Sequence, residues 1–470
     1  MADIEVGSAA RPLRVAIIGS GPSAFYAAEA LFKSGRCVRV DMFDRLPTPY
    51  GLVRGGVAPD HQKIKTVTKL YTKIADDPGF RFFGNVKLGR DLQVEDLTER
   101  YDQVVYAVGN ESDRKMSVAG EGLDGVHSAT SFVGWYNGHP DYRDLQFDLG
   151  STTRAVVVGN GNVAIDVARI LVRDPDELAD TDIADHALEA LRASRVREVV
   201  LLGRRGPAQA AFSPKEIQEV GDLSGVDVMV PSAEVELDPL SAEWLESSAS
   251  RSAQRNVRYL VEQSQQPEGS APRRVQCRFL VSPVELVGDG GRVSGVRLQH
   301  NELQADSRGT PRPTPVEKFE DLDAQLVFAA IGYRGVAIPG VPFDDGWGVI
   351  PNVDGRVQVA RDGEVVPNQY VVGWAKRGPT GLIGTNSPDS KATVAAMLQD
   401  SAGRTSPALE DGDASSIEQL LDDRGVAFVT YEDWQRLDQF ELDRGREKGK
   451  IRDKLTSVAE MLEVVQKLRS

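Results

Sequence analysis

The chain has 470 residues, and its 70 acidic side chains outnumber its 55 Lys and Arg to give a formal net charge of −15 at pH 7. This surplus argues against nucleic acid as the main partner, because phosphate backbones attract basic surfaces. No apolar run approaches the roughly 20 residues of a membrane span, and no basic and then apolar leader opens the chain. The two cysteines, Cys37 and Cys277, have neither CxxC nor metal-ligand spacing. We expect a cytoplasmic protein without structural disulfides or a bound metal.

The first predicted strand, residues 15–18, leads into the glycine fingerprint GSGPSA at residues 19–24, and a helical pattern follows. In a G-x-G-x-x-G/A motif the first glycine makes a tight turn and the second lets the backbone approach a pyrophosphate. The small last residue lets the helix pack on the strand, and the pyrophosphate lies at the helix N-terminus. The next strand, residues 38–43, ends at Asp44. An acid at this position suits the ribose hydroxyls of an adenosine.

Residues 45–59 are rich in Pro and Gly and yet apolar. This composition is typical of a segment that runs along a bound cofactor rather than of a solvated linker, and we call it the cofactor loop. From His61 the pattern becomes helical, with Lys65, Lys69 and Lys73 on one face.

A second fingerprint, GNGNVA at residues 159–164, follows another apolar strand and also opens a helix. A later strand, residues 197–203, ends at Arg204 and Arg205. A site for NAD favours an acid here, whereas paired guanidiniums suit the 2′-phosphate of NADP. The spacing from fingerprint to arginines is longer than usual, and we attribute the excess to an insertion at 173–192. The two fingerprints predict two dinucleotides on one chain.

Two similar patterns, each a buried strand ending in glycine, occur at residues 101–109 and 324–332. Because the second fingerprint lies between them, we predict an α/β fold of two Rossmann-like dinucleotide-binding domains, one inserted into the other. The outer domain then comprises residues 1–110 and 331–470, and the inserted domain comprises 111–330. Each crossing is a candidate hinge.

A glycine-rich turn follows a strand that ends at Gly373 and Trp374, and Ser387-Pro388-Asp389 opens a helix. A helix N-terminus beside a flavin stabilises the negative charge of the reduced ring. Trp374 offers a flat surface for a ring system. Beyond this turn we expect residues 401–425 to form a loop and 432–469 a charged helical stretch.

Five segments closely resemble the adrenodoxin reductase family, most of all its bacterial NADPH–ferredoxin reductase members. They are Val15–Ala24, Leu46–Gln62, Gly159–Arg169, Gly203–Phe212 and Gly373–Asn386, and the resemblance extends over nearly the whole chain. It implies a glutathione-reductase-like flavoprotein architecture with FAD in the outer domain and NADPH in the inserted one. It also implies hydride transfer from NADPH to flavin N5, then single-electron delivery to a ferredoxin or adrenodoxin-like iron–sulfur protein.

The resemblance assigns site residues position by position. It implies FAD contacts at Gly19, Gly21, Pro22, Ser23, Ala24, Asp44, Leu52, Val86, Gly109, Trp374, Gly381, Leu382 and Ile383. It implies NADP contacts at Arg114, Asn160, Gly161, Asn162, Val163, Arg204, Arg205, Glu216 and Gly381. Gly381 is expected where nicotinamide meets flavin, so a side chain there would obstruct stacking. His61 and Glu219 match the family's active-site pair and would tune the proton movements that accompany the one-electron steps.

Two other functions fit the same motifs. A flavin-dependent NADPH oxidase or monooxygenase would also hold FAD and NADPH, and a redox-sensing module would hold both without turnover. The lack of a CxxC motif argues against disulfide-reductase chemistry. An acidic ferredoxin would need a local basic patch, and the candidates are Lys65, Lys69 and Lys73 or Arg192, Arg195 and Arg197.

Overall fold

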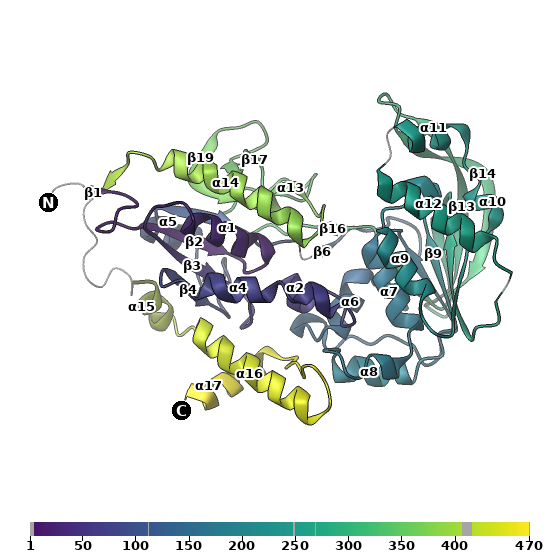
Figure 1. Ribbon diagram of the computed structural model, residues 1–470, viewed down its shortest axis with the longest axis horizontal. Helices are drawn as coiled ribbons and strands as arrows, with labels where there is room; N and C mark the ends of the chain where they lie inside the picture. The colour runs from purple at the N-terminus through teal and green to yellow at the C-terminus, as the bar shows by residue number, and fades with distance from the viewer. Residues whose placement is uncertain (1–3, 111, 248–249, 268, 407–415, 470) are drawn as a thin grey trace. The chain divides into compact units, whose positions relative to one another are not determined.

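The computed structural model describes residues 4–110, 112–247, 250–267, 269–406 and 416–469 (Figure 1). The chain forms two compact units. Unit 1 combines Met1–Asp113 with Gly332–Ser470, and unit 2 is Arg114–Ile331, so the sequence of unit 2 interrupts that of unit 1. None of the helices in these described ranges is long and apolar enough to cross a membrane.

Unit 1 is built on a seven-stranded sheet of order β17-β18-β19-β5-β2-β3-β4. In chain order its strands are β2 (Leu13–Ile18), β3 (Val38–Phe43), β4 (Phe80–Phe83), β5 (Gln103–Tyr106), β17 (Asn352–Val353), β18 (Arg356–Gln358) and β19 (Val365–Val371). β19, β5, β2, β3 and β4 pair in parallel, so their carboxyl ends share one edge of the sheet. β2 and β3 are buried almost throughout, as parallel strands covered on both faces require.

Helices from both ends of the chain cover this sheet. α1 (Pro22–Phe32) packs against α14 (Asn386–Asp400), which comes from the C-terminal part of unit 1 (Figure 1). The other helices of unit 1 are α2 (Leu52–Gly55), α3 (Gln62–Lys65), α4 (Thr68–Ala75), α5 (Val94–Arg100), α13 (Trp374–Arg377), α15 (Ser416–Asp423), α16 (Tyr431–Glu447) and α17 (Val458–Arg469), with a 3-10 turn η4 (Ile383–Thr385). Two short ribbons pair β1 (Ile4–Glu5) with β20 (Thr405–Ser406) and β6 (Ser112–Asp113) with β16 (Tyr333–Arg334).

Unit 2 has a six-stranded sheet of order β10-β11-β9-β8-β15-β7 in which every pairing is parallel. Its strands are β7 (Val126–Ser128), β8 (Arg154–Val158), β9 (Glu198–Leu202), β10 (Val226–Met229), β11 (Arg273–Arg278) and β15 (Leu326–Ala329). A separate antiparallel sheet contains β12 (Val281–Asp289), β13 (Arg292–Ala305) and β14 (Pro311–Asp323). The helices are α6 (Ala129–Tyr136), α7 (Asn162–Val172), α8 (Asp185–Arg192), α9 (Pro214–Gly221), α10 (Ser232–Val235), α11 (Pro239–Ser247) and α12 (Arg251–Ser264), with 3-10 turns at Pro140–Tyr142, Pro175–Glu177 and Pro207–Gln209.

The predicted α/β fold with two Rossmann-like parallel sheets is confirmed, but two C-terminal predictions need correction. Residues 401–425 are not all loop, because Ile417 and Leu421 pack into the core one helical turn apart and define α15. The part of this prediction that covers residues 407–415 lies outside the described residues. The helical stretch 432–469 is divided between α16 and α17, and Gly449 between them has a φ of +72°, which a continuing helix does not allow.

The helix expected from His61 is also interrupted. α3 ends at Lys65 and α4 begins at Thr68. The hydroxyls of Thr66 and Thr68 donate back to the carbonyls three residues earlier, at 2.6 and 2.9 Å, and this local bonding competes with a continuous helix. Lys65 therefore belongs to α3, whereas Lys69 and Lys73 belong to α4.

Candidate dinucleotide sites

Each parallel strand of the unit 1 sheet is followed by a residue that the sequence assigned to FAD. Gly19 follows β2, Asp44 follows β3, Val86 lies just beyond β4, Gly109 lies beyond β5, and Trp374 follows β19. Ligands of parallel α/β sheets bind at the carboxyl ends of the strands. The topology therefore brings these five residues to the edge of the sheet where a dinucleotide is expected.

The fingerprint has one glycine in close contact and one that faces open space. Gly19 has a φ of +99°, and a Cβ there would lie 2.5 Å from the Ala107 carbonyl oxygen. A Cβ on Gly21 would meet no atom within 4 Å. Gly21 is the N-cap of α1 and supplies no side-chain cap, so the start of the helix is left for a ligand's oxygens. Pro22 opens α1, and Ser23 and Ala24 are buried in its first turn.

The Asp44 carboxylate is held in place by the backbone around it. Its Oδ2 accepts from the Ser20 N–H at 3.0 Å and the Ser20 hydroxyl at 2.5 Å, and its Oδ1 accepts from the Leu46 N–H at 2.9 Å. The Val86 N–H donates to the Asp44 carbonyl at 2.8 Å. Asp44 and Val86 are thus fixed beside the fingerprint.

The C-terminal glycine turn packs directly on α1. A Cβ on Gly373 would collide with the Ser23 hydroxyl, and the Ser390 hydroxyl donates to the Ser23 carbonyl at 2.9 Å. Trp374 is half-buried and lies against Tyr333, with ring centroids 5.2 Å apart and the ring planes tilted by 34°. Within the turn, Leu382 is 65% exposed, whereas Ile383 packs against the core.

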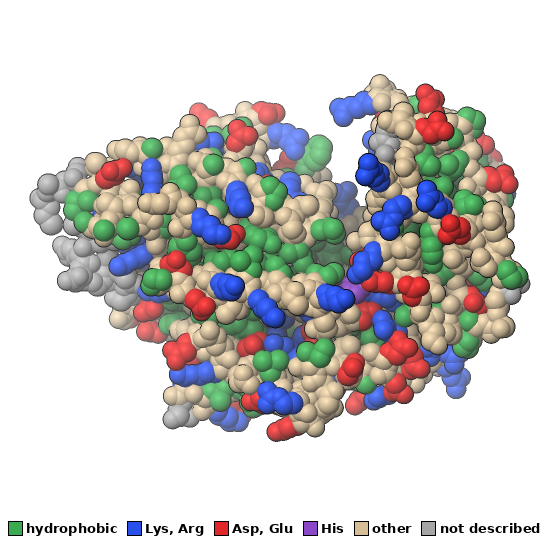
Figure 2. Space-filling view, viewed as in Figure 1, with side chains coloured by type: hydrophobic (Ala, Val, Ile, Leu, Met, Phe, Trp, Pro, Cys, Tyr) green, Lys and Arg blue, Asp and Glu red, His purple; other side chains and the backbone are tan. Residues whose placement is uncertain are grey.

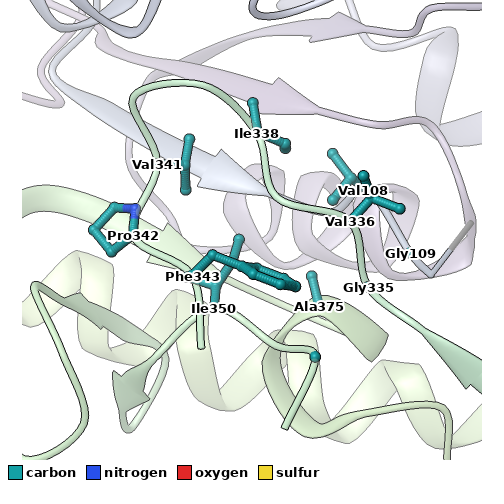
Figure 3. A pocket seen from close by; sticks show the side chains of 11 residues that line it. Val108, Gly109, Gly335, Val336, Ile338, Val341, Pro342, Phe343, Ile350 and Ala375 are labelled. Atoms are coloured by element: carbon teal, nitrogen blue, oxygen red, sulfur yellow. The ribbon is translucent and has the colours of Figure 1, made fainter. Parts of the chain in front are cut away.

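Asn110, which the sequence prediction missed, supplies an independent test of whether this edge suits a polar ligand. Its side chain is only 6% exposed, and among the described residues neither its amide nitrogen nor its amide oxygen has a hydrogen-bond partner. An orphaned buried amide is costly unless a ligand or water satisfies it. Asn110 directly follows Gly109 and so lies among the FAD candidates. A pocket beside Gly109, lined by apolar side chains such as Ile338 and Phe343, holds about 10 Å³ and is too small for a nucleotide (Figure 3).

The second fingerprint repeats the geometry of the first at the carboxyl edge of the unit 2 sheet. A Cβ on Gly159 would collide with the Ala330 carbonyl, whereas one on Gly161, the N-cap of α7, would meet no atom within 4 Å. The Asn160 carbonyl accepts from the N–H groups of residues 211 and 212 at 3.0 and 2.9 Å. The Asn162 side chain accepts from the Ser213 N–H at 2.8 Å. Asn160 and Asn162 thereby anchor the segment that leads to α9, and Val163 packs at the edge of the core.

Arg204 and Arg205 follow β9 at this same edge. Arg204 is exposed and Arg205 is half-buried, and within the described part of the chain neither forms an ion pair with a carboxylate. Burial, followed by the charges of Arg204 and Arg312, lowers the pKa of Arg205. A guanidinium remains charged despite such a shift. The turn therefore carries an excess of positive charge, which a phosphate would neutralise.

A buried arginine links the fingerprint helix to α9, and sequence reasoning did not single it out. Arg169 is 1% exposed. It pairs with Asp166 at 2.6 Å on its own helix and with Glu216 at 3.4 Å on α9. Glu216, a predicted NADP contact, is thus oriented by α7. Glu219, one turn further along α9, pairs with Lys215 at 2.9 Å.

The remaining predicted residues belong to separate units. His61 is the N-cap of α3 in unit 1, whereas Glu219 lies in unit 2, and Arg114 is the exposed first residue of unit 2. The pairing of His61 with Glu219 stays a prediction. Burial raises the pKa of the Cys277 thiol to about 12, which leaves it unreactive, and the two cysteines form no CxxC motif.

Two parallel sheets, each with an open glycine fingerprint at its carboxyl edge, define a two-dinucleotide oxidoreductase. The family model for pyridine nucleotide-disulphide oxidoreductases matches residues 13–219. The chain is 47% identical over 463 residues to the NADPH-ferredoxin reductase FprA of Mycobacterium tuberculosis, covering 97% of this chain and 99% of the relative. It is 40% identical over 463 residues to the mitochondrial NADPH:adrenodoxin oxidoreductase of Arabidopsis thaliana, covering 97% and 96%.

A solved structure agrees with these relatives. Mycobacterium tuberculosis FprA in complex with NADPH matches with a TM-score of 0.91 at 46% identity, over 97% of this chain and 100% of that one. The chain belongs to the family of NADPH–ferredoxin and adrenodoxin reductases. The resemblance seen in the five sequence segments is therefore confirmed.

Proposed function

We propose that this protein is an FAD-dependent NADPH–ferredoxin reductase. The observation that carries the proposal is the duplicated sheet edge. One fingerprint is followed by the fixed acid Asp44, and the other by Arg204 and Arg205, which pair with no carboxylate among the described residues. An acid suits the adenosine ribose of FAD, and the cations suit the 2′-phosphate of NADPH. The relatives named as reductases of ferredoxin and adrenodoxin support the same reading.

In this proposal unit 1 holds FAD and unit 2 holds NADPH. Bound FAD supplies the chemistry, since it takes up a hydride and gives electrons on singly. The protein supplies geometry: Gly21 and Gly161 leave room for the pyrophosphates, Asn110 offers an unsatisfied amide, and Gly381 keeps the nicotinamide–flavin contact clear. His61 and Glu219 are proposed to hold and move protons near the flavin.

The acceptor is proposed to be an acidic iron–sulfur protein that binds a basic face on α3 and α4. Lys69 and Lys73 of the expected patch are exposed, whereas Lys65 is half-buried. Lys63, which was not part of the expected patch, is exposed as well, and among the described residues no carboxylate pairs with Lys63, Lys69 or Lys73. A row of basic side chains follows these helices in Figure 2. Residues 61–75 contain no acidic side chain, although the whole chain carries a net charge of −15. Such a segregated patch attracts an acidic partner and raises its rate of association.

The second basic patch expected from sequence suits this role less well. Arg192 pairs with Asp176 at 3.1 Å, and Arg197 donates to the Val196 carbonyl at 3.1 Å. A different arginine face, Arg251, Arg255 and Arg258 on α12, is exposed and has no ion pair within the described ranges. It was not singled out from the sequence.

The proposal is tested by cofactor content and acceptor range. The purified protein is expected to carry one FAD per chain and to reduce ferredoxins with NADPH far faster than with NADH. A protein free of flavin, or one that turns over only with oxygen, would contradict it. A cytoplasmic location is part of the proposal, and fractionation of the host cell would check it.

A further inference from the structure

The C-terminal helices of unit 1 reach the cofactor loop through a buried ion pair. The guanidinium of Arg54, on α2, donates hydrogen bonds to both carboxylate oxygens of Glu441, on α16, at 2.8 and 2.6 Å. The two residues are 387 positions apart in sequence. Such a bidentate pair fixes orientation as well as distance.

Glu441 is the centre of a charge network inside the segment Tyr431–Arg469, which we call the clasp. Glu441 has no exposed surface. Its carboxylate also accepts from the Arg452 guanidinium at 3.0 Å and from the Leu455 N–H at 2.9 Å. Burial raises the pKa of Glu441, but the two arginines and this N–H outweigh it and hold the pKa below its usual value. The carboxylate is therefore charged, and its partners keep it so.

Three further contacts tie the clasp to the cofactor loop. The Arg54 guanidinium lies over the Trp434 ring, 5.1 Å from its centroid. The hydroxyls of Tyr50 and Tyr431 are 2.9 Å apart. The Lys454 ammonium donates to the Arg54 carbonyl at 3.2 Å. The clasp thus holds the loop at both a side chain and the backbone.

The opposite side of the same loop lies against the FAD fingerprint. The Tyr50 N–H donates to the Ser20 carbonyl at 3.0 Å, and a Cβ on Gly51 would lie 3.0 Å from the Gly21 Cα. Tyr50 has a φ of +85°, a conformation that a tyrosine keeps only where its surroundings enforce it. Leu52, a predicted FAD contact, stands between Tyr50 and Arg54.

We propose that the clasp retains FAD by pressing the cofactor loop against the fingerprint, and that Glu441 is a positioning residue acting through Arg54. The proposal rests on the proposed function only in taking FAD as the group that unit 1 holds. It predicts that breaking the clasp weakens FAD binding while unit 1 remains folded and the NADPH site of unit 2 is unaffected.

Arg54→Met tests this, because it removes the loop side of the pair while Arg452 still neutralises Glu441. Flavin fluorescence after dilution of the holoprotein measures FAD release. We expect the Kd for FAD to rise at least tenfold, with the KM for NADPH within twofold of wild type and the thermal midpoint in excess FAD little changed. Glu432→Gln is the matched control on α16, since its pair with Arg436 is solvent-exposed, and it should retain FAD like wild type.

A Kd for FAD within twofold of wild type in Arg54→Met would overturn the proposal. A thermal midpoint that falls sharply even in excess FAD would also overturn it, because the ion pair would then be needed for folding rather than for retention. Arg54→Lys keeps the positive charge but cannot form the bidentate pair with Glu441. We expect this variant to release FAD faster than wild type and more slowly than Arg54→Met. If wild type itself bound no FAD, the proposed function would fail instead, so the two failures are distinguishable.

Discussion

Single side chains distinguish the two nucleotide sites by charge. At the unit 1 edge Asp44 accepts three hydrogen bonds from backbone and hydroxyl donors, and its position is fixed. At the unit 2 edge Arg205 is half-buried beside two other cations, and none of the described carboxylates pairs with it. In the proposed function, the fixed carboxylate of Asp44 serves the adenosine ribose of FAD, and the uncompensated positive charge of Arg205 serves the 2′-phosphate of NADPH.

The double substitution Arg204→Ala with Arg205→Ala is expected to raise the KM for NADPH strongly and to leave NADH almost unchanged. A charge-assisted hydrogen bond contributes about 1.5–3 kcal/mol, which corresponds to about 10- to 160-fold for each arginine. Steady-state kinetics with both coenzymes checks this. Equal losses for the two coenzymes would refute a phosphate-binding role.

Gly381 offers a second test at this scale. Its φ is +83°, and a Cβ would collide with the Thr385 hydroxyl. We expect Gly381→Ala to slow flavin reduction by NADPH more than tenfold in anaerobic stopped flow, because the side chain would strain the turn and crowd the nicotinamide. Gly384→Ala is the control, since a Cβ there meets no atom within 4 Å. Equal rates in the two variants would contradict the assignment.

Local sequence motifs were enough to predict most of the candidate site residues. Residues whose role depends on contacts with distant parts of the chain could not be predicted. Gly19, Asp44 and Arg204 could be predicted because strand, turn and helix signals surround them in sequence. Arg169 could not, because its partner Glu216 comes from another helix 47 residues away. Asn110 could not either, because an unsatisfied amide is visible only once its surroundings are folded.

At the scale of elements, the spacing of apolar residues along the sequence identified the parallel strands but did not show where helices are interrupted. Residues 15–18 of β2 and 155–158 of β8 read as unbroken apolar runs and are buried. The break between α3 and α4 comes from threonine hydroxyls that bond to the backbone, a competition that apolar spacing does not show. α15 was missed because it is short and adjoins a polar stretch.

The basic face of α3 and α4 gives the prediction that belongs to this scale. Reversing two charges, Lys69→Glu with Lys73→Glu, is expected to raise the KM for ferredoxin about tenfold or more at low salt, and added salt should shrink the difference. The rate with a small inorganic acceptor should stay as in wild type. The same reversal at Arg251 and Arg255 on α12 is the comparison. Unchanged ferredoxin kinetics in the lysine variant would remove this face from the docking surface.

For the whole molecule, the sequence of one dinucleotide unit interrupts that of the other. The chain leaves unit 1 after β6 and returns at β16, and these two segments pair with each other. C-terminal elements complete unit 1: α14 packs on α1, and the clasp holds the cofactor loop. The interrupted order was predicted from the two similar strand–glycine patterns on either side of the second fingerprint. The clasp could not be predicted, because Arg54 and Glu441 lie near opposite ends of the chain.

Ion pairs in the C-terminal part of unit 1 predict a loss of stability in acid. A hydrogen bond from Arg356 lowers the pKa of Asp400. Burial raises the pKa of Asp433 and of Glu441, but Arg469 with Thr430 at Asp433, and Arg54 with Arg452 and the Leu455 N–H at Glu441, outweigh burial and lower both pKa values. Carboxylates with lowered folded pKa values stabilise fully above their unfolded values, about 4 to 4.5, and that contribution is lost as the pH falls through the folded values. We expect thermal midpoints to be similar at pH 5 to 7 and to fall steeply below about pH 4. A midpoint that is flat down to pH 3 would contradict this account.

The central claim is that NADPH reduces a flavin in this protein and that an iron–sulfur protein then collects the electrons. Anaerobic stopped flow tests it most directly: the purified protein is mixed with NADPH, and the reduced product is then mixed with either oxidised ferredoxin or oxygen. The account predicts rapid flavin bleaching by NADPH, rapid recovery of colour with ferredoxin and slow recovery with oxygen. No bleaching would indicate a sensing module, and rapid recovery with oxygen alone would indicate an oxidase or monooxygenase; either result would contradict the claim.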